Sequence, residues 1–193
     1  MTSLLYWILA YLLAAIPGAI IVSKLVGSPN PLHSGSNNPG TTNMLRIAGK
    51  LSAAYTLAFD VLKVFLPLKF AQHTGLSQHT ILGIAIFAFI GHLFPIYLRF
   101  KGGKGVAVSL AILLALSPSI ALIATSIWVT TAWITRYSSL AALTSCVGTT
   151  LLSFFLSNNE VSQLILFIAV LMFIKHKKNI VRLWLGQESK IHF

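Results

Sequence analysis

The sequence has very few acidic residues: Asp60, Glu160 and Glu188 are the only carboxylate side chains among its 193 residues. Magnesium sites and glycosidases need paired or clustered carboxylates, and three scattered acids do not provide them. The sequence also lacks a Cys/His cluster with zinc-binding spacing, and the single Cys146 excludes an internal disulfide. We therefore expect a protein that works without a metal or another cofactor.

Charge of either sign is scarce as well. Charged residues make up 9% of the chain, hydrophobic residues 56%, and the mean hydropathy is +0.83. Soluble domains have about a quarter charged residues, so this composition indicates a polytopic membrane protein. We expect one membrane domain over residues 1–193. No basic stretch precedes the first apolar run, residues 4–22, and no small-residue cleavage pattern follows it, so we interpret that run as a retained span.

The apolar segments predict an all-α protein with seven transmembrane helices. A membrane-spanning helix needs about 20 apolar residues. The segment 105–135 is too long for one upright span and short for two, but the Ser-Pro-Ser turn signal at 117–119 divides it near its middle. Two spans there bring the total to seven. The other five are expected at 4–26, 51–71, 80–98, 139–157 and 161–175.

The basic residues predict the orientation of these spans. With seven spans, the basic loops and the basic tail share one side of the membrane, which the positive-inside rule assigns to the cytoplasm. A single span over 105–135 would move Arg136 and the tail outside. We therefore expect a periplasmic N-terminus and a cytoplasmic C-terminus. The net charge of +11 would also suit a nucleic-acid partner, but basic loops that fix the topology are the simpler explanation.

Two polar, glycine-containing loops lie on the predicted cytoplasmic side. Residues 34–46, SGSNNPGTTNMLR, combine hydroxyls, amides, two glycines and Arg46. Residues 100–106, FKGGKGV, place two lysines and two adjacent glycines before an apolar helix. Backbone N–H groups in such turns bind anions. The second loop is not a nucleotide-binding P-loop, because Gly105 follows Lys104 where Ser or Thr is required. An ordinary turn with topology-setting charges remains the alternative for both.

Other polar side chains are expected on the same side. His176 and Asn179 are spaced i,i+3 and share one helical face. The stretch 136–140, RYSSL, adds two serines, and His92 lies near the cytoplasmic end of the predicted span 80–98. Each of these residues could equally be structural.

Asp60 and Lys63 lie inside the second predicted span, at i,i+3, and can form an ion pair within the helix. Charges inside a span often mark function, but a pair that neutralises itself can also be structural. Both interpretations stay open. No Ser-His-acid set is evident, because we expect Glu160 on the opposite side of the membrane and Asp60 in the pair with Lys63. The polar motifs therefore suit the binding of anionic substrates, either by an enzyme or by a transport or binding protein for an organic phosphate.

Four segments carry a resemblance to a known family: GSNNPGTTNMLR, GHLFPIYLRFKGGKGVA, RYSSLAA and HKKNIVRLWLGQE. In order and spacing, over essentially the whole chain, they resemble the motifs of the bacterial acyl-phosphate-dependent glycerol-3-phosphate acyltransferases. The resemblance implies a seven-span inner-membrane enzyme of phospholipid synthesis. Such enzymes move a fatty acyl group from acyl phosphate to the 1-hydroxyl of glycerol 3-phosphate, giving lysophosphatidate and phosphate. They use no metal, and they are functionally coupled to the enzyme that makes acyl phosphate.

The resemblance also implies roles for individual residues. It leaves the general base open between His176 and a phosphate oxygen of the substrate. The sequence departs from the family at Asn37 and Val64, where glycine is usual, and at Ala142, where serine is usual, and we assign no role to these three. The expected catalytic residues are His176, Asn179, Ser36 and Ser139, and the expected substrate- and phosphate-binding residues are Arg46, Lys104, Gly102, Gly103 and Asn43.

Overall fold

The computed structural model describes residues 2–191, and within that range it contains helices and no strands. The chain forms two compact units, Met1–Ala115 and Leu116–Phe193, each with its own packing. Five helical stretches in the described range are long and apolar enough to cross a membrane: Ser3–Leu25, Thr41–His73, Gln78–Leu98, Pro118–Thr135 and Ser138–Leu156. The expectation of an all-α membrane protein is confirmed at this level.

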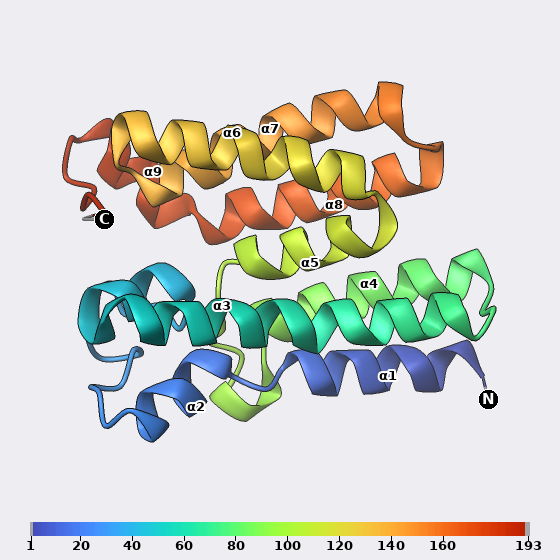
Figure 1. Ribbon diagram of the computed structural model, residues 1–193, viewed down its shortest axis with the longest axis horizontal. Coiled ribbons are helices and arrows are strands. Elements are labelled where there is room, and N and C mark those ends of the chain that lie inside the picture. The colour runs from blue at the N-terminus through green and yellow to red at the C-terminus, as the bar shows by residue number, and fades with distance from the viewer. Residues whose placement is uncertain (1, 192–193) are drawn as a thin grey trace. The chain divides into compact units, whose positions relative to one another are not determined.

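The first unit is built from α1 (Ser3–Ala14), α2 (Gly18–Leu25), α3 (Thr41–His73), α4 (Gln78–Leu93), the short 3₁₀ helix η1 (Ile96–Leu98) and α5 (Val106–Leu116), whose last residue belongs to the second unit. Helix α1 packs along α4, and α3 packs against both of them (Figure 1). The helices come close because α4 carries glycine where α1 touches it. A Cβ at Gly83 would overlap the Trp7 indole, and one at Gly91 would overlap the Tyr11 carbonyl.

Helix α3 bends near its start. Gly49 has φ 81° and ψ −178°, which is outside the helical region, so it separates the first two turns from the long apolar part. Glycine reaches this conformation without a steric penalty. The polar residues of the first loop therefore continue into a short, separate helical segment. The predicted start of the second span at residue 51 agrees with this break.

The second unit contains α6 (Pro118–Thr135), α7 (Ser138–Leu156), α8 (Asn159–Lys175) and α9 (Lys177–Trp184). Helix α7 packs against both α6 and α8, and α9 contacts α7 and α8. Buried hydroxyls join these helices: Ser145 Oγ donates to the Ala124 carbonyl at 2.7 Å, and Ser162 Oγ donates to the Ser153 carbonyl at 2.8 Å.

The tail returns to the turn between α6 and α7, because the Ile191 N–H donates to the Arg136 carbonyl at 2.7 Å. This contact brings the last described residues of the chain to the start of α7.

The predicted division of residues 105–135 is confirmed. Helix α5 ends at Leu116, and α6 begins at Pro118, the first helical position, where proline is well tolerated. Helices α5 and α8 have 11 and 17 residues, which is short for an upright span.

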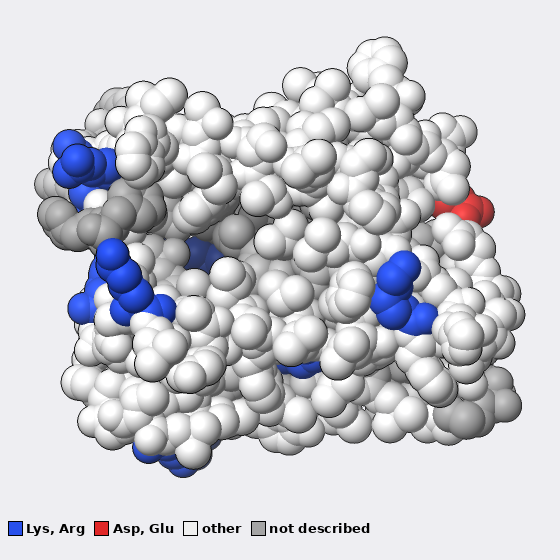
Figure 2. Space-filling model, in the orientation of Figure 1, with Lys and Arg blue, Asp and Glu red and all other residues white. Residues whose placement is uncertain are grey.

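The molecular surface also fits a lipid environment. Large apolar side chains are exposed along the helices, for example Phe155 at 85% and Leu122 at 70%. Figure 2 shows one face on which uncharged residues predominate, with a few separate basic patches and a single small acidic one. Exposed apolar area of this extent marks a contact with membrane.

Candidate active site

The first polar loop is organised around the side chain of Asn43, which is 1% exposed. Its amide oxygen accepts from the Ser36 N–H at 2.8 Å, and its amide nitrogen donates to the carbonyls of Pro31 at 3.0 Å and Ser34 at 2.9 Å. Both ends of the amide are thus engaged within the loop. We infer that Asn43 fixes the loop, while its predicted contact with substrate phosphate stays a prediction.

The loop turns through two residues with positive φ, Gly35 at 63° and Asn37 at 55°. No other residue fits at Gly35 without a steric clash, because a Cβ there would overlap the Asn43 amide. At Asn37, where the family resemblance predicted glycine, asparagine is among the residues that best tolerate the left-handed region. The departure therefore keeps the turn. Ser36 is exposed between these two residues, and Arg46 is half-buried in the short helix that follows.

The second polar loop is pressed against the end of α4. The Gly103 N–H donates to the His92 carbonyl at 3.2 Å. A Cβ at Gly102 would overlap the same carbonyl, and a Cβ at Gly103 would overlap His92 Nε2. Both glycines are therefore needed for the close approach. Lys104 follows, half-buried, just before α5 begins at Val106.

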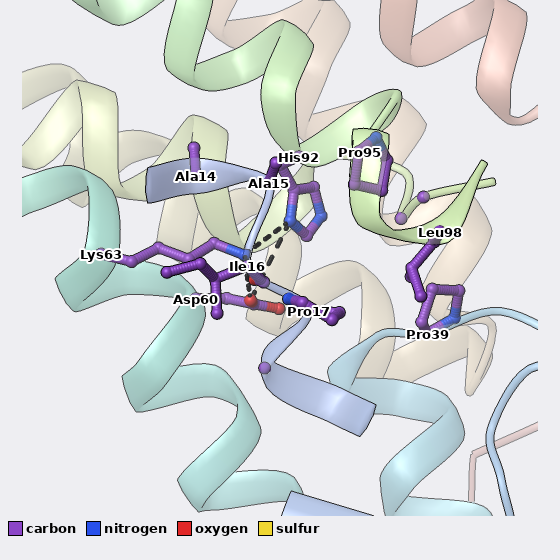
Figure 3. Close-up of a pocket in the computed structure, with 13 residues that line it drawn as sticks. Ala14, Ala15, Ile16, Pro17, Pro39, Asp60, Lys63, His92, Pro95 and Leu98 are labelled. Atoms are coloured by element: carbon purple, nitrogen blue, oxygen red, sulfur yellow. Dashed lines mark hydrogen bonds and ion pairs between the residues drawn. The ribbon is translucent and has the colours of Figure 1, made fainter. Parts of the chain in front are cut away.

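This loop lines a small cavity through Gly102 and Gly103. Its other walls come from the break between α1 and α2, from α3 and from the end of α4 (Figure 3). Its volume is ≈ 10 Å³, room for about one water molecule. Lys63 Nζ lies 2.7 Å from Asp60 Oδ1, so the predicted ion pair is confirmed. The same ammonium donates to the Ile16 carbonyl at 2.8 Å and lies 3.3 Å from His92 Nδ1. The cavity is too small to enclose an organic phosphate.

In the second unit, the carboxylate of Glu188 connects several polar side chains. Ser139 Oγ and Asn179 Nδ2 donate to Oε1 at 2.7 and 2.6 Å, and Arg182 Nε donates to Oε2 at 2.6 Å. Ser139, Asn179 and Glu188 are buried. Burial raises the pKa of the Glu188 carboxyl, but the hydrogen bonds from Ser139, Asn179 and Arg182 and the charge of Arg182 outweigh it, so the pKa lies below its ordinary value.

His176 sits where α8 meets α9 and is 2% exposed. Its Nδ1 lies 2.8 Å from the Met172 carbonyl oxygen. A carbonyl can only accept, so Nδ1 carries the proton, and in the neutral ring Nε2 holds the lone pair. That tautomer suits a base or an acceptor at Nε2. Asn179 is close, since its N–H donates to the His176 carbonyl at 2.8 Å.

The structure thus groups the predicted residues into two sets. The first unit holds the two loops that were predicted to bind anions, with the predicted residues Ser36, Asn43, Arg46, Gly102, Gly103 and Lys104. The second unit joins Ser139 to Asn179 through Glu188, with His176 one turn before Asn179. Among residues 2–191 no group of His, Cys, Asp and Glu could hold a metal ion.

Sequence reasoning missed Glu188 as a member of this set. The available signal was its position: it is the only acid in a tail that is otherwise basic.

Comparisons with known proteins agree with these features. The family model described as "Glycerol-3-phosphate acyltransferase" matches residues 4–186. The chain is 44% identical to the glycerol-3-phosphate acyltransferase of Laribacter hongkongensis, with 99% of this chain and 97% of the relative covered. It is 46% identical to the enzyme of the same name from Francisella tularensis subsp. novicida, with 95% and 90% covered.

Solved structures give the same result. The chain is similar to PlsY (YgiH), an integral membrane glycerol 3-phosphate acyltransferase, in its glycerol 3-phosphate form, with a TM-score of 0.91, 33% identity, and 98% and 96% of the two chains covered. The lysophosphatidic acid form gives 0.89 and 32%, with 98% and 95% covered. The fold and its polar clusters define a multi-pass membrane acyltransferase. The chain belongs to the glycerol-3-phosphate acyltransferase family.

Proposed function

We propose that this protein transfers a fatty acyl group from acyl phosphate to the 1-hydroxyl of glycerol 3-phosphate, releasing lysophosphatidate and inorganic phosphate. The observation that carries the proposal is the similarity over 98% of the chain to an acyltransferase whose solved forms are described by glycerol 3-phosphate and by lysophosphatidic acid. Those two molecules are the acceptor and the product of this reaction. The alternative, a transporter or binding protein for an organic phosphate, is not favoured, because the relatives are named as acyltransferases.

The reaction proceeds by direct transfer. Acyl phosphate is a mixed anhydride, so its carbonyl carbon is already activated and phosphate is a good leaving group. The acceptor hydroxyl oxygen forms a new bond to that carbon, the bond from the carbon to the phosphate oxygen breaks, and the hydroxyl proton passes to a base. Holding the two substrates together supplies most of the required rate enhancement.

The first unit's loops bind phosphate. The Gly102 N–H, together with Lys104 and Arg46, offsets the repulsion between two anionic substrates and stabilises the departing phosphate, while the Gly103 N–H, which donates to the His92 carbonyl, fixes the shape of the loop. Ser36 adds a hydroxyl donor from the first loop. In the second unit, Ser139 and Asn179 orient the acceptor, and His176 Nε2 or a substrate phosphate oxygen takes the proton.

The protein acts in the bacterial inner membrane as one polytopic domain with seven spans. Helices α5 and α8 add two short spans to the five longer ones, which places every basic loop in the cytoplasm. Acyl phosphate is reactive toward water, so the protein is functionally coupled to the enzyme that makes it.

The choice of acyl donor tests this function. Purified protein mixed with acyl phosphate and glycerol 3-phosphate, without coenzyme A or acyl carrier protein, is expected to release inorganic phosphate and form lysophosphatidate in equal amounts. Acyl-CoA is expected to react at least about 100-fold more slowly, because its acyl carbon is bonded to a thiol sulfur and not to the phosphate that the cationic loops would hold beside the acceptor. Equal rates with both donors would contradict the proposed donor, and uptake of glycerol 3-phosphate into vesicles without lysophosphatidate would favour transport.

Labelling of introduced cysteines tests the seven-span topology, in a background in which buried Cys146 is replaced by serine. Cysteines at the exposed positions Ser36, Lys101 and Ser189 are expected to react with a membrane-impermeant reagent only from the cytoplasmic side. Cysteines at exposed Gln78 and Asn159 are the controls and should react only from the periplasmic side. A reversed result at any one of these positions would contradict the topology.

A further inference from the structure

Asp60, Lys63 and His92 form a buried polar cluster between α3 and α4 (Figure 3). These residues are 1%, 8% and 7% exposed. Ionised groups inside a membrane protein are costly, so they need a structural or functional reason. The proposed reaction uses none of the three side chains.

The contacts around Lys63 indicate which ring nitrogen of His92 carries the proton. An ammonium group has three N–H donors and no acceptor. Three acceptors surround Nζ: Asp60 Oδ1 at 2.7 Å, the Ile16 carbonyl at 2.8 Å and His92 Nδ1 at 3.3 Å. Nδ1 therefore accepts, and the ring proton lies on Nε2. A proton on Nδ1 would point at the ammonium.

The opposite side of the imidazole faces the second polar loop. His92 Nε2 occupies the space where a Cβ at Gly103 would lie, and the His92 carbonyl accepts from the Gly103 N–H at 3.2 Å. The Gly102 backbone packs against the same carbonyl. His92 therefore contacts both glycines of the loop, and Lys63 contacts the opposite edge of its ring at Nδ1.

If Asp60 and Lys63 served only to neutralise each other, the Lys63 ammonium would need no contact beyond the Asp60 carboxylate. Here the ammonium also links the break between α1 and α2, through Ile16, to the end of α4, through His92. We propose that Asp60 and Lys63 are positioning residues that act through His92 to hold the Gly102–Gly103 loop in its phosphate-binding form. This inference rests on the proposed function of that loop.

The first test removes the ion pair without leaving a buried charge. The double variant Asp60→Leu/Lys63→Met should fold, because replacing both partners of a buried pair by apolar groups is tolerated far better than removing one. If the pair positions the loop, the KM for at least one phosphate substrate rises about 10- to 100-fold, although thermal stability is close to that of the wild type. If the double variant has both the stability and the KM values of the wild type, the pair does not position the loop and the proposal is overturned.

The matched control is Lys69→Met, which removes an exposed lysine from the same helix. It should leave the stability and both KM values unchanged. A similar rise of KM in this control would mean that loss of a lysine from α3 weakens substrate binding wherever that lysine lies, and that result would overturn the proposal.

Two His92 variants make the second test, which is decisive even if the double variant does not fold. In His92→Gln the amide nitrogen can take the place of Nε2–H beside Gly103, whereas in His92→Asn the shorter side chain can only replace Nδ1 beside Lys63. Glutamine loses the contact with Lys63 and asparagine loses the contact beside Gly103, so each variant is expected to raise at least one KM about 10-fold or more.

A glutamine variant that keeps wild-type KM values although it has lost the contact with Lys63 would overturn the proposal. Failure of the proposed function would appear separately, as an absence of phosphate release by the wild-type protein.

Discussion

Replacement of Glu188 by glutamine is expected to remove most of the activity and to lower the stability of the protein by about 3 kcal/mol. The glutamine oxygen can still accept from Ser139 and Asn179, as Oε1 does now. Its amide nitrogen, however, would meet the Arg182 Nε–H that Oε2 now accepts, so two donors would face each other. Ser139 and Asn179 would then lose the fixed position that the carboxylate gives them.

The matched control is Glu160→Gln, which neutralises an exposed acid in the first turn of α8. It should change stability by less than about 0.5 kcal/mol and leave activity unaffected. The measurements are thermal unfolding of detergent-purified protein and phosphate release. A Glu188→Gln variant as stable and as active as the Glu160→Gln variant would contradict the assigned role of the carboxylate.

The same carboxylate predicts an acid dependence of stability. The folded pKa of Glu188 is lower than its ordinary value of 4.5, because three donors hold the ionised form. Its contribution to stability is therefore complete above that value and is lost as the pH falls through the lower, folded pKa. Below pH 4.5 the wild type should lose melting temperature more steeply than Glu188→Gln. Parallel curves would contradict this prediction.

Much of the fold was predictable because it depends on local pattern. Apolar length located the helices, and the Ser-Pro-Ser signal located the break between α5 and α6. The ion pair between Asp60 and Lys63 followed from i,i+3 spacing alone. Each of these features is specified by residues within a single helix or at the turn that ends it.

The features that sequence reasoning missed depend on contacts between distant residues. Ser139 and Glu188 are 49 positions apart and meet only because the tail returns to the start of α7. The contact between His92 and Lys63 spans 29 positions and two helices. No spacing rule within one helix could reveal either pair. The bend at Gly49 was not signalled either, since a lone glycine in a helical pattern is usually accommodated.

His176 is the residue whose variants would identify the base. If Nε2 takes the proton of the acceptor hydroxyl, His176→Ala should lower kcat about 10²- to 10⁴-fold, with a smaller change in KM. The acidic limb of the pH–rate profile should disappear as well, because that limb would report protonation of the imidazole. If a substrate phosphate oxygen is the base, the limb should remain, since phosphate titrates near pH 6 on its own, and the main effect should be weaker binding of glycerol 3-phosphate.

His176→Asn separates catalysis from structure. The asparagine amide can still donate to the Met172 carbonyl, as Nδ1 does at 2.8 Å, but it has no basic nitrogen in place of Nε2. A structural role would therefore be rescued by asparagine and not by alanine, whereas loss of a base would make both variants equally slow. Single-turnover measurements with saturating substrates would compare the chemical step directly. An asparagine variant that matches the wild type in both kcat and pH profile would exclude His176 as the base and leave the substrate phosphate to accept the proton.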